Sequence, residues 1–183
     1  MSGQAGPLSA WPIREVMARS GAMRAVAYSL AICAVSCALE ALFAGDEVKK
    51  RLATMRLPPG SPPFWAWVMI GAFYYAICFM VSYRLFSRPP GFTRDIALAL
   101  LGTLMFINAL WNYFFFRSHN LFHAYLLGLL YGVGTVVLFI LLLRLDRVAG
   151  WCLLSYILYL LYASIWSYRV WQLNPAGKSR DDT

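Results

Sequence analysis

The sequence has few acidic residues, and they are almost absent from its long apolar segments. It carries 8 Asp and Glu against 16 Lys and Arg, which gives a net charge of +8. Charged residues make up 13% of the 183-residue chain and hydrophobic residues 61%. A soluble domain of this size could not bury that much apolar surface. The composition therefore excludes a soluble globular protein and indicates that lipid surrounds the fold.

Residues that commonly carry enzyme chemistry are also scarce. The 4 cysteines all lie within apolar segments, so no disulfide framework is indicated. The histidines His119 and His123 have no Cys or acid nearby to complete a metal site. There is no phosphate-binding loop, no G-x-G-x-x-G fingerprint and no Ser/His/Asp arrangement. We predict no metal site and no catalytic residue from these patterns.

Five apolar segments are each long enough to cross a bilayer. A helical span needs about 20 mostly apolar residues. A segment in hydrocarbon must satisfy its own backbone hydrogen bonds, which favours helix. We therefore predict an all-α integral membrane bundle of five transmembrane helices, in a single domain covering residues 25–174. The expected spans are residues 25–44, 64–86, 96–116, 121–143 and 148–171.

Three further segments lie outside the expected spans. Residues 1–24 are predicted to form a polar N-terminal arm, and residues 175–183 a polar C-terminal tail. The linker 45–63 begins with the apolar spacing of a short amphipathic helix at the interface. It ends in a proline-rich stretch that must run extended into the second span. We expect this linker to act as a lid over one end of the bundle.

Basic residues gather at the span ends instead of forming one patch. This distribution is typical of charges that meet lipid headgroups, so the bilayer is the expected partner and no nucleic acid is expected. With five spans, the 16 basic residues divide equally between the two sides. The positive-inside rule therefore assigns no orientation. We predict a multi-pass membrane protein, with the particular membrane left open.

A few residues inside the spans are candidates for a ligand site. Asn108 is an amide in mid-span, and it either bonds across helices or faces a ligand; the two roles are compatible. Tyr75 and Trp111 lie deeper than the aromatic residues at the span ends, so they either pack or stack on a flat ligand. Glu40 is a carboxylate about one turn from the end of its span, and we expect it to reach the interface.

Three sequence blocks resemble one known family. They are Ser61-Pro-Pro-Phe-Trp65 followed by Tyr75; Asn108-Ala-Leu-Trp111 with Phe115-Phe116; and Leu145-Asp146, Ala149-Gly150, Tyr156 and Trp171-Gln-Leu-Asn174. In their order, spacing and placement on helices, these blocks resemble the translocator protein / tryptophan-rich sensory protein family (TspO/MBR). Members of that family are small five-helix membrane proteins.

The resemblance implies a hydrophobic pocket between helices, closed on one side by the first linker. The ligands implied are porphyrins, sterols and other flat lipophilic compounds, which the protein binds or transports. Porphyrin or haem would be a ligand, and no cofactor is required. Carried over position by position, the pocket would be lined by Trp65, Tyr75, Asn108, Trp111, Phe115, Tyr156, Tyr159 and Ala163.

The chain departs from the family pattern where porphyrin chemistry is concerned. The two tryptophans to which the family's breakdown of porphyrin is attributed align with Gly71 and Tyr159. The resemblance therefore favours binding over catalysis. Two alternatives remain open: a porphyrin-degrading enzyme, since tyrosine also carries radicals, and a membrane scaffold or regulator whose pocket is vestigial.

Small residues in the third and fourth spans permit close helix approach. They serve either packing within one bundle or association of two copies. The family's tendency to dimerise favours a homodimer. The positions concerned are Ala97, Gly102, Gly128, Gly132 and Gly134.

Overall fold

The structure, a computed structural model, describes residues 11–46 and 48–175, with side chains from residue 19 onward. Five helices in these ranges are long and apolar enough to cross a membrane, which confirms the predicted all-α bundle. They are joined by one short helix and one π-helical turn. The elements are α1 (Trp11–Ala44), α2 (Val48–Thr54), α3 (Phe64–Phe86), α4 (Phe92–Asn112), η1 (Tyr113–Arg117), α5 (Leu121–Leu145) and α6 (Arg147–Leu173).

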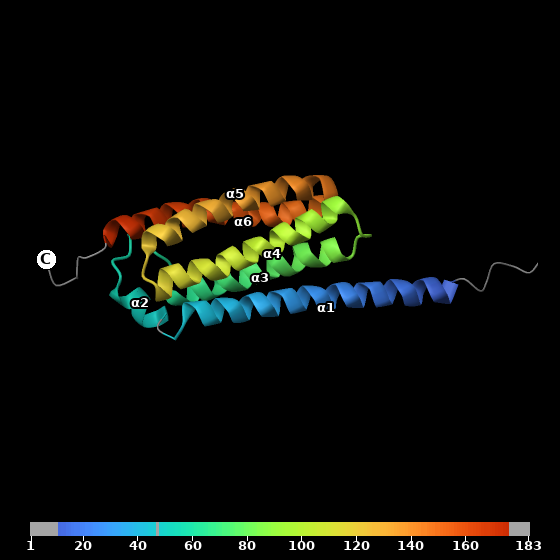
Figure 1. The fold of residues 1–183 in the computed structure, drawn as a ribbon, viewed down its shortest axis with the longest axis horizontal. Helices are drawn as coiled ribbons and strands as arrows, with labels where there is room; N and C mark the ends of the chain where they lie inside the picture. Colours follow the sequence, from blue (N-terminus) through green and yellow to red (C-terminus); the bar gives the residue numbers. More distant parts are fainter. Residues whose placement is uncertain (1–10, 47, 176–183) are drawn as a thin grey trace, which may run out of the picture.

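The five long helices pack as a ring of neighbours (Figure 1). α1 lies against α3 and α4, α3 lies against α6, and α5 lies against α4 and α6. Short connections make consecutive helices antiparallel, and Asp146 alone separates α5 from α6. α1 begins at Trp11, so part of the segment predicted as a polar arm is helical, and this end of α1 extends past the α3–α4 connection.

The packed core fills the part of the bundle away from α2. Its buried members are mainly aliphatic side chains on α3, α4, α5 and α6. The backbones approach closely there: a Cβ added to Gly134 would lie 2.8 Å from Leu104 Cδ2, and one added to Gly150 would lie 3.1 Å from Leu143 Cδ2. Ala97 is also fully buried. Among the small residues expected to permit close approach, Ala97 and Gly134 therefore serve packing within the chain.

An ion-paired turn closes this end of the bundle. The carboxylate of Asp146 accepts from Arg84 Nε at 2.7 Å and from Arg88 Nη2 at 3.2 Å. It also accepts from the backbone N–H of Ala149 at 3.1 Å and so caps the start of α6. Burial by itself raises the pKa of Asp146, but these hydrogen bonds and the positive charge of Arg84 outweigh it and hold the pKa below its ordinary value.

The opposite end of α4 widens into the π-helix η1. The backbone N–H of Ser118 donates to the carbonyl of Tyr113 at 2.9 Å, a bond that spans five residues. On this turn Phe115 faces inward and is 1% exposed. π-helical turns often occur at functional sites, and this one delivers an aromatic ring to the region of the cavities described next.

Candidate ligand pocket

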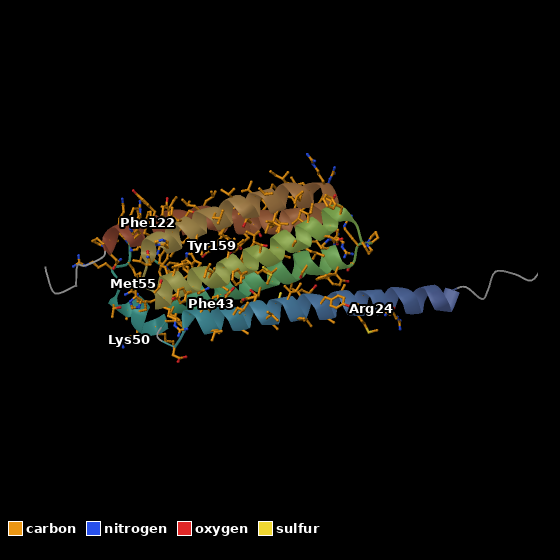
Figure 2. The ribbon with its side chains drawn as sticks, viewed as in Figure 1. Arg24, Phe43, Lys50, Met55, Phe122 and Tyr159 are labelled. Atoms are coloured by element: carbon orange, nitrogen blue, oxygen red, sulfur yellow. The ribbon has the colours of Figure 1, made fainter. Side chains whose placement is uncertain are left out.

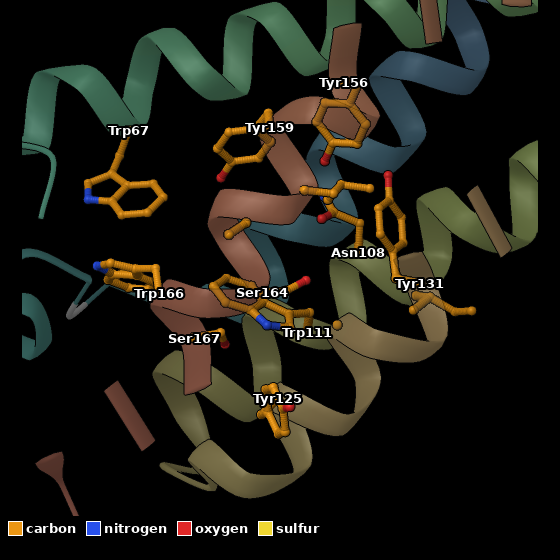
Figure 3. A pocket seen from close by; sticks show the side chains of 14 residues that line it. Trp67, Asn108, Trp111, Tyr125, Tyr131, Tyr156, Tyr159, Ser164, Trp166 and Ser167 are labelled. Carbon is orange, nitrogen blue, oxygen red and sulfur yellow. The ribbon is translucent and has the colours of Figure 1, made fainter. Parts of the chain in front are cut away.

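A hollow lies between the helices at the α2 end of the bundle (Figure 3). It consists of two cavities, of about 100 and 270 Å³, with common walls. The wall residues shared by the two cavities come from α3, α4 and α6. They are Trp67, Asn108, Trp111, Tyr156, Tyr159 and Trp166.

Aromatic rings form most of the wall. Trp67 and Trp166 face each other with ring centroids 4.8 Å apart, as Figure 3 shows on one side of the hollow. Phe115 stacks on Trp111 at 4.7 Å and on Trp166 at 5.8 Å. Rigid flat side chains offer large apolar faces to a flat ligand, which can stack on them or meet their edges. The arrangement is suited to a planar, lipid-soluble molecule.

One part of the wall is polar. Asn108 Nδ2 donates to Glu40 Oε1 at 2.6 Å, and both residues line the larger cavity. Glu40 therefore does not reach the interface, contrary to the sequence-based expectation. The reason is that the last turns of α1 still pack against α4 and η1, so this face of α1 is directed into the bundle. Asn108 both bridges two helices and lines the hollow.

The segment 45–63 covers this end of the bundle. Met55 is 5% exposed and packs in one apolar cluster with Phe115 and Trp166. Trp166 Nε1 donates to Ser61 Oγ at 2.9 Å, which ties the segment to α6. Figure 2 shows Met55 and Lys50 at this end of the molecule, with Tyr159 further inside.

The end of α6 latches the same segment. The backbone N–H of Arg56 donates to Asn174 Oδ1 at 2.9 Å, and Asn174 Nδ2 donates to the carbonyl of Arg56 at 2.9 Å. We call this pair of bonds the Asn174 latch. It joins residues 118 positions apart in the sequence, and it gives the W-x-L-N end of α6 a structural role that sequence reasoning did not assign.

Comparison with known proteins identifies the family. The family model of TspO/MBR matches residues 29–172. The chain belongs to the TspO/MBR family. Protein CrtK of Rhodobacter capsulatus is 25% identical over 155 residues, which cover 80% of this chain and 90% of that protein. Translocator protein of Ovis aries is 26% identical over 129 residues, which cover 69% of this chain and 76% of that protein.

The structure of this TspO/MBR protein brings most of the residues carried over from the family resemblance to the hollow. Asn108, Trp111, Tyr156 and Tyr159 line both cavities, Phe115 lines the larger one and Ala163 the smaller one.

Trp65 and Tyr75 line neither cavity. Trp65 is 69% exposed on the outer side of α3. The side chain of Trp67, two positions further, faces inward because residues two apart lie on nearly opposite faces of a helix. Tyr75 has a buried hydroxyl that lies near Ser36 and Glu40. Sequence reasoning did not single out Trp67 or Trp166, and the seven tryptophans of the chain offered no pattern that separated them from lipid-facing ones.

The two positions at which the family resemblance implies a tryptophan share one wall. Gly71 and Tyr159 both line the larger cavity. A Cβ added to Gly71 would meet no atom within 4 Å, so the space beside it is open. The departures from the family pattern thus leave the hollow in place and change the groups that face it.

The two histidines have structural positions in the η1–α5 turn. His119 adopts a positive φ of 56°, and the backbone N–H of His123 donates to Asn120 Oδ1 at 3.1 Å, capping α5. The His123 ring stacks on Phe114. Among the side chains of residues 19–46 and 48–175, no group of three His, Cys, Asp or Glu is close enough together to hold a metal ion.

Proposed function

We propose that this TspO/MBR protein binds porphyrins or other flat lipophilic compounds, sterols among them, in the hollow between α3, α4 and α6. The observation that carries the proposal is an aromatic-walled cavity with one polar side, placed inside a bundle that spans the membrane. Together the two cavities reach the lower part of the range for ligand sites, about 300–1,000 Å³. A flat ligand would gain stacking area on the tryptophans and a hydrogen bond at Asn108 or Glu40.

We propose that the covering segment moves to admit such a ligand. The segment is held to α6 by the Asn174 latch, by the bond from Trp166 to Ser61, and by the packing of Met55. These contacts are fewer than those that hold the long helices together. We propose that the segment 45–63 opens and closes over the ligand. Whether the ligand is carried into or across the membrane then depends on the side of the membrane on which the protein releases it.

A titration with a matched pair of variants tests the proposal. Ala163 lines the smaller cavity, whereas Leu158 on the same helix is 62% exposed to lipid. Ala163→Trp should fill the hollow and weaken binding of protoporphyrin IX at least about tenfold, roughly 1.4 kcal/mol. Leu158→Trp adds the same indole outside and should bind like wild type. Binding is followed in mild detergent by porphyrin absorbance.

Each other outcome favours a different function. Equal affinity in wild type and both variants would place the ligand outside the hollow. A wild-type protein that binds no porphyrin would favour the scaffold or regulator alternative. Binding followed by time-dependent bleaching in light would favour the porphyrin-degrading enzyme, with the wall tyrosines Tyr156 and Tyr159 as the candidate radical carriers.

We also propose that the protein forms a homodimer. An added Cβ at Gly102 or Gly132 would meet no atom within 4 Å, and both residues lie in apolar grooves on the outside of the bundle. Such positions allow two helices from separate copies to approach closely. Mass measurement in mild detergent with added lipid should give twice the chain mass. A mass of one chain under all lipid conditions contradicts the proposal.

A further inference from the structure

The polar side of the hollow has hydrogen-bond acceptor positions that the surrounding side chains do not fill. The bond from Asn108 uses one of the two oxygens of the Glu40 carboxyl group. The hydroxyl of Tyr75 also lies near Glu40, and in the described part of the chain no hydrogen bond reaches the side-chain oxygen of Asn108. A carboxylate can accept about four hydrogen bonds. The side chains here therefore leave acceptor capacity open toward the larger cavity.

Glu40 also lacks a counter-charge. Among the side chains described, those of residues 19–46 and 48–175, Arg84 and Arg88 pair with Asp146, Arg94 pairs with Asp95, and no ion pair involves Glu40. Its polar neighbours on α3 are the buried hydroxyl groups of Tyr74 and Tyr75, which carry no positive charge. A carboxylate inside a membrane bundle is costly unless a cation or several donors accompany it. Among the side chains that the structure describes, Glu40 therefore has no cationic partner.

The remaining wall is suited to a cation. Trp111 follows Asn108 by three residues on α4, so the two side chains lie on one face of that helix. Trp67 and Trp166 complete an aromatic wall around the same cavity. Protonated amines are attracted to the faces of tryptophan rings, and the attraction grows when the amine is desolvated. A carboxylate beside several aromatic faces is a combination that recognises an amine.

Resting on the proposed function, we infer that Glu40 makes the hollow selective for flat lipophilic ligands that carry a protonated amine at one edge. Such a ligand would place its ring among the tryptophans and its ammonium N–H groups on Glu40 and on the side-chain oxygen of Asn108. The hydrogen bond between these residues holds the acceptors in place before the ligand arrives. Neutral ligands of the same shape gain less binding free energy at this site. A ligand carboxylate at that edge is repelled by the carboxylate of Glu40.

Three porphyrins that share one macrocycle and differ in the charge of their edge substituents test the inference. The probes are protoporphyrin IX, its neutral dimethyl ester, and its bis-amide with 2-(dimethylamino)ethylamine, which is cationic at pH 7. Wild-type protein in non-ionic detergent should bind the bis-amide about tenfold more tightly than the dimethyl ester, as a charge-assisted bond exceeds a neutral one. Glu40→Gln should remove that preference and leave the affinity for the ester within about twofold. Asp95→Asn, which removes the charge of an exposed carboxylate in the first turn of α4, should behave as wild type.

The outcomes separate the inference from the proposed function. If wild type binds the ester and the bis-amide equally, or if Glu40→Gln keeps the preference, the inference is wrong while the pocket stands. If wild type binds none of the three, both are wrong.

A second measurement needs no variant. Dicyclohexylcarbodiimide should label Glu40 in wild type, with the bis-amide protecting it and the dimethyl ester protecting it less. Equal protection by the two porphyrins contradicts selection by Glu40.

Discussion

The two ends of the helix bundle are closed in different ways. At the α5–α6 turn, aliphatic side chains such as Val81, Leu138 and Leu142 are fully buried, and Asp146 joins three helices through Arg84, Arg88 and its cap on α6. At the α2 end, large rings meet and leave cavities of about 100 and 270 Å³. Branched aliphatic chains interdigitate to high density, whereas rigid rings leave gaps when they meet at angles. One end therefore holds the fold together and the other provides space for a ligand.

The two ends also differ in the contacts that must break for each to open. The turn at Asp146 is a single residue between two long helices, so it cannot open without moving both. The segment 45–63 can lift from the α2 end by breaking the Asn174 latch and the packing of Met55. The comparison predicts that variants at the first end change stability alone. Variants at the second end should change ligand behaviour.

The largest expected effect is at Asp146. Asp146→Ala removes the cap of α6 and the shared partner of two arginines, which are themselves about a third or more exposed. We expect a loss of about 2 kcal/mol, since caps contribute about 0.5–2 and exposed pairs less. Thermal unfolding in detergent measures it, with porphyrin affinity per folded molecule unchanged. The control is Asp95→Ala, an exposed carboxylate paired with its neighbour Arg94. A similar loss in the control would contradict the account.

The same residue predicts a pH dependence. The folded-state pKa of Asp146 is lowered, so its contribution is fully present above the unfolded pKa of about 4 and is lost as pH falls through the folded value. Between pH 7 and pH 5, the difference in melting temperature between wild type and Asp146→Asn should stay constant. Below about pH 4 the difference between the two proteins should shrink. A constant difference down to pH 2.5 would count against this role.

Asn108 should give a smaller loss of stability together with a loss of ligand affinity. Asn108→Ala removes a hydrogen-bond donor from Glu40, which is only partly buried, so the expected loss is about 1 kcal/mol. The same change removes a polar group from both cavities. Melting temperature and porphyrin titration should both shift. A shift in stability alone would mean that Asn108 only bridges helices. The control is Thr103→Ala, whose hydroxyl bonds only within α4.

The Asn174 latch should affect ligand exchange more than stability. Asn174→Ala removes two hydrogen bonds to the backbone of Arg56, a loss of about 1 kcal/mol at this exposed site. We expect faster release of bound porphyrin in stopped-flow displacement. Gln172→Ala, which removes only a bond to Tyr168 within α6, should release it at the wild-type rate. Equal rates in all three proteins would show that the segment 45–63 does not control access.

Tryptophans introduced at positions 71 and 159 should have the smallest effect on stability but should change the photochemistry of a bound porphyrin. Gly71→Trp and Tyr159→Trp restore the family tryptophans at two wall positions, and the space beside Gly71 is open. The double variant should stay folded and gain light-dependent bleaching of protoporphyrin IX. Porphyrin absorbance under illumination measures this gain. Bleaching in neither wild type nor the variant, with binding retained, would mean that tryptophans at these positions are insufficient for the reaction.

The fold could be predicted from sequence because a bilayer demands long apolar helices. The five spans were identified correctly on that basis, and the family was identified correctly from three sequence blocks. Positions that depend on tertiary contacts were harder. The inward direction of Glu40 depends on α1 packing against α4 up to its last turns, and the partner of Asn174 is remote in the sequence. The π-helical turn at Tyr113 has no pattern of its own, and the choice of Trp67 over Trp65 needs the rotation of α3.

The central claim is that the hollow at the α2 end holds a flat lipophilic ligand. The most direct measurement is photo-crosslinking of a diazirine derivative of protoporphyrin dimethyl ester to the wild-type protein in lipid nanodiscs, followed by peptide mass spectrometry. The account predicts adducts on Trp67, Trp111, Tyr159 or Trp166, reduced by excess unlabelled ester. Adducts confined to lipid-facing residues such as Leu130, Val133 and Leu161, with no competition by the ester, would contradict it.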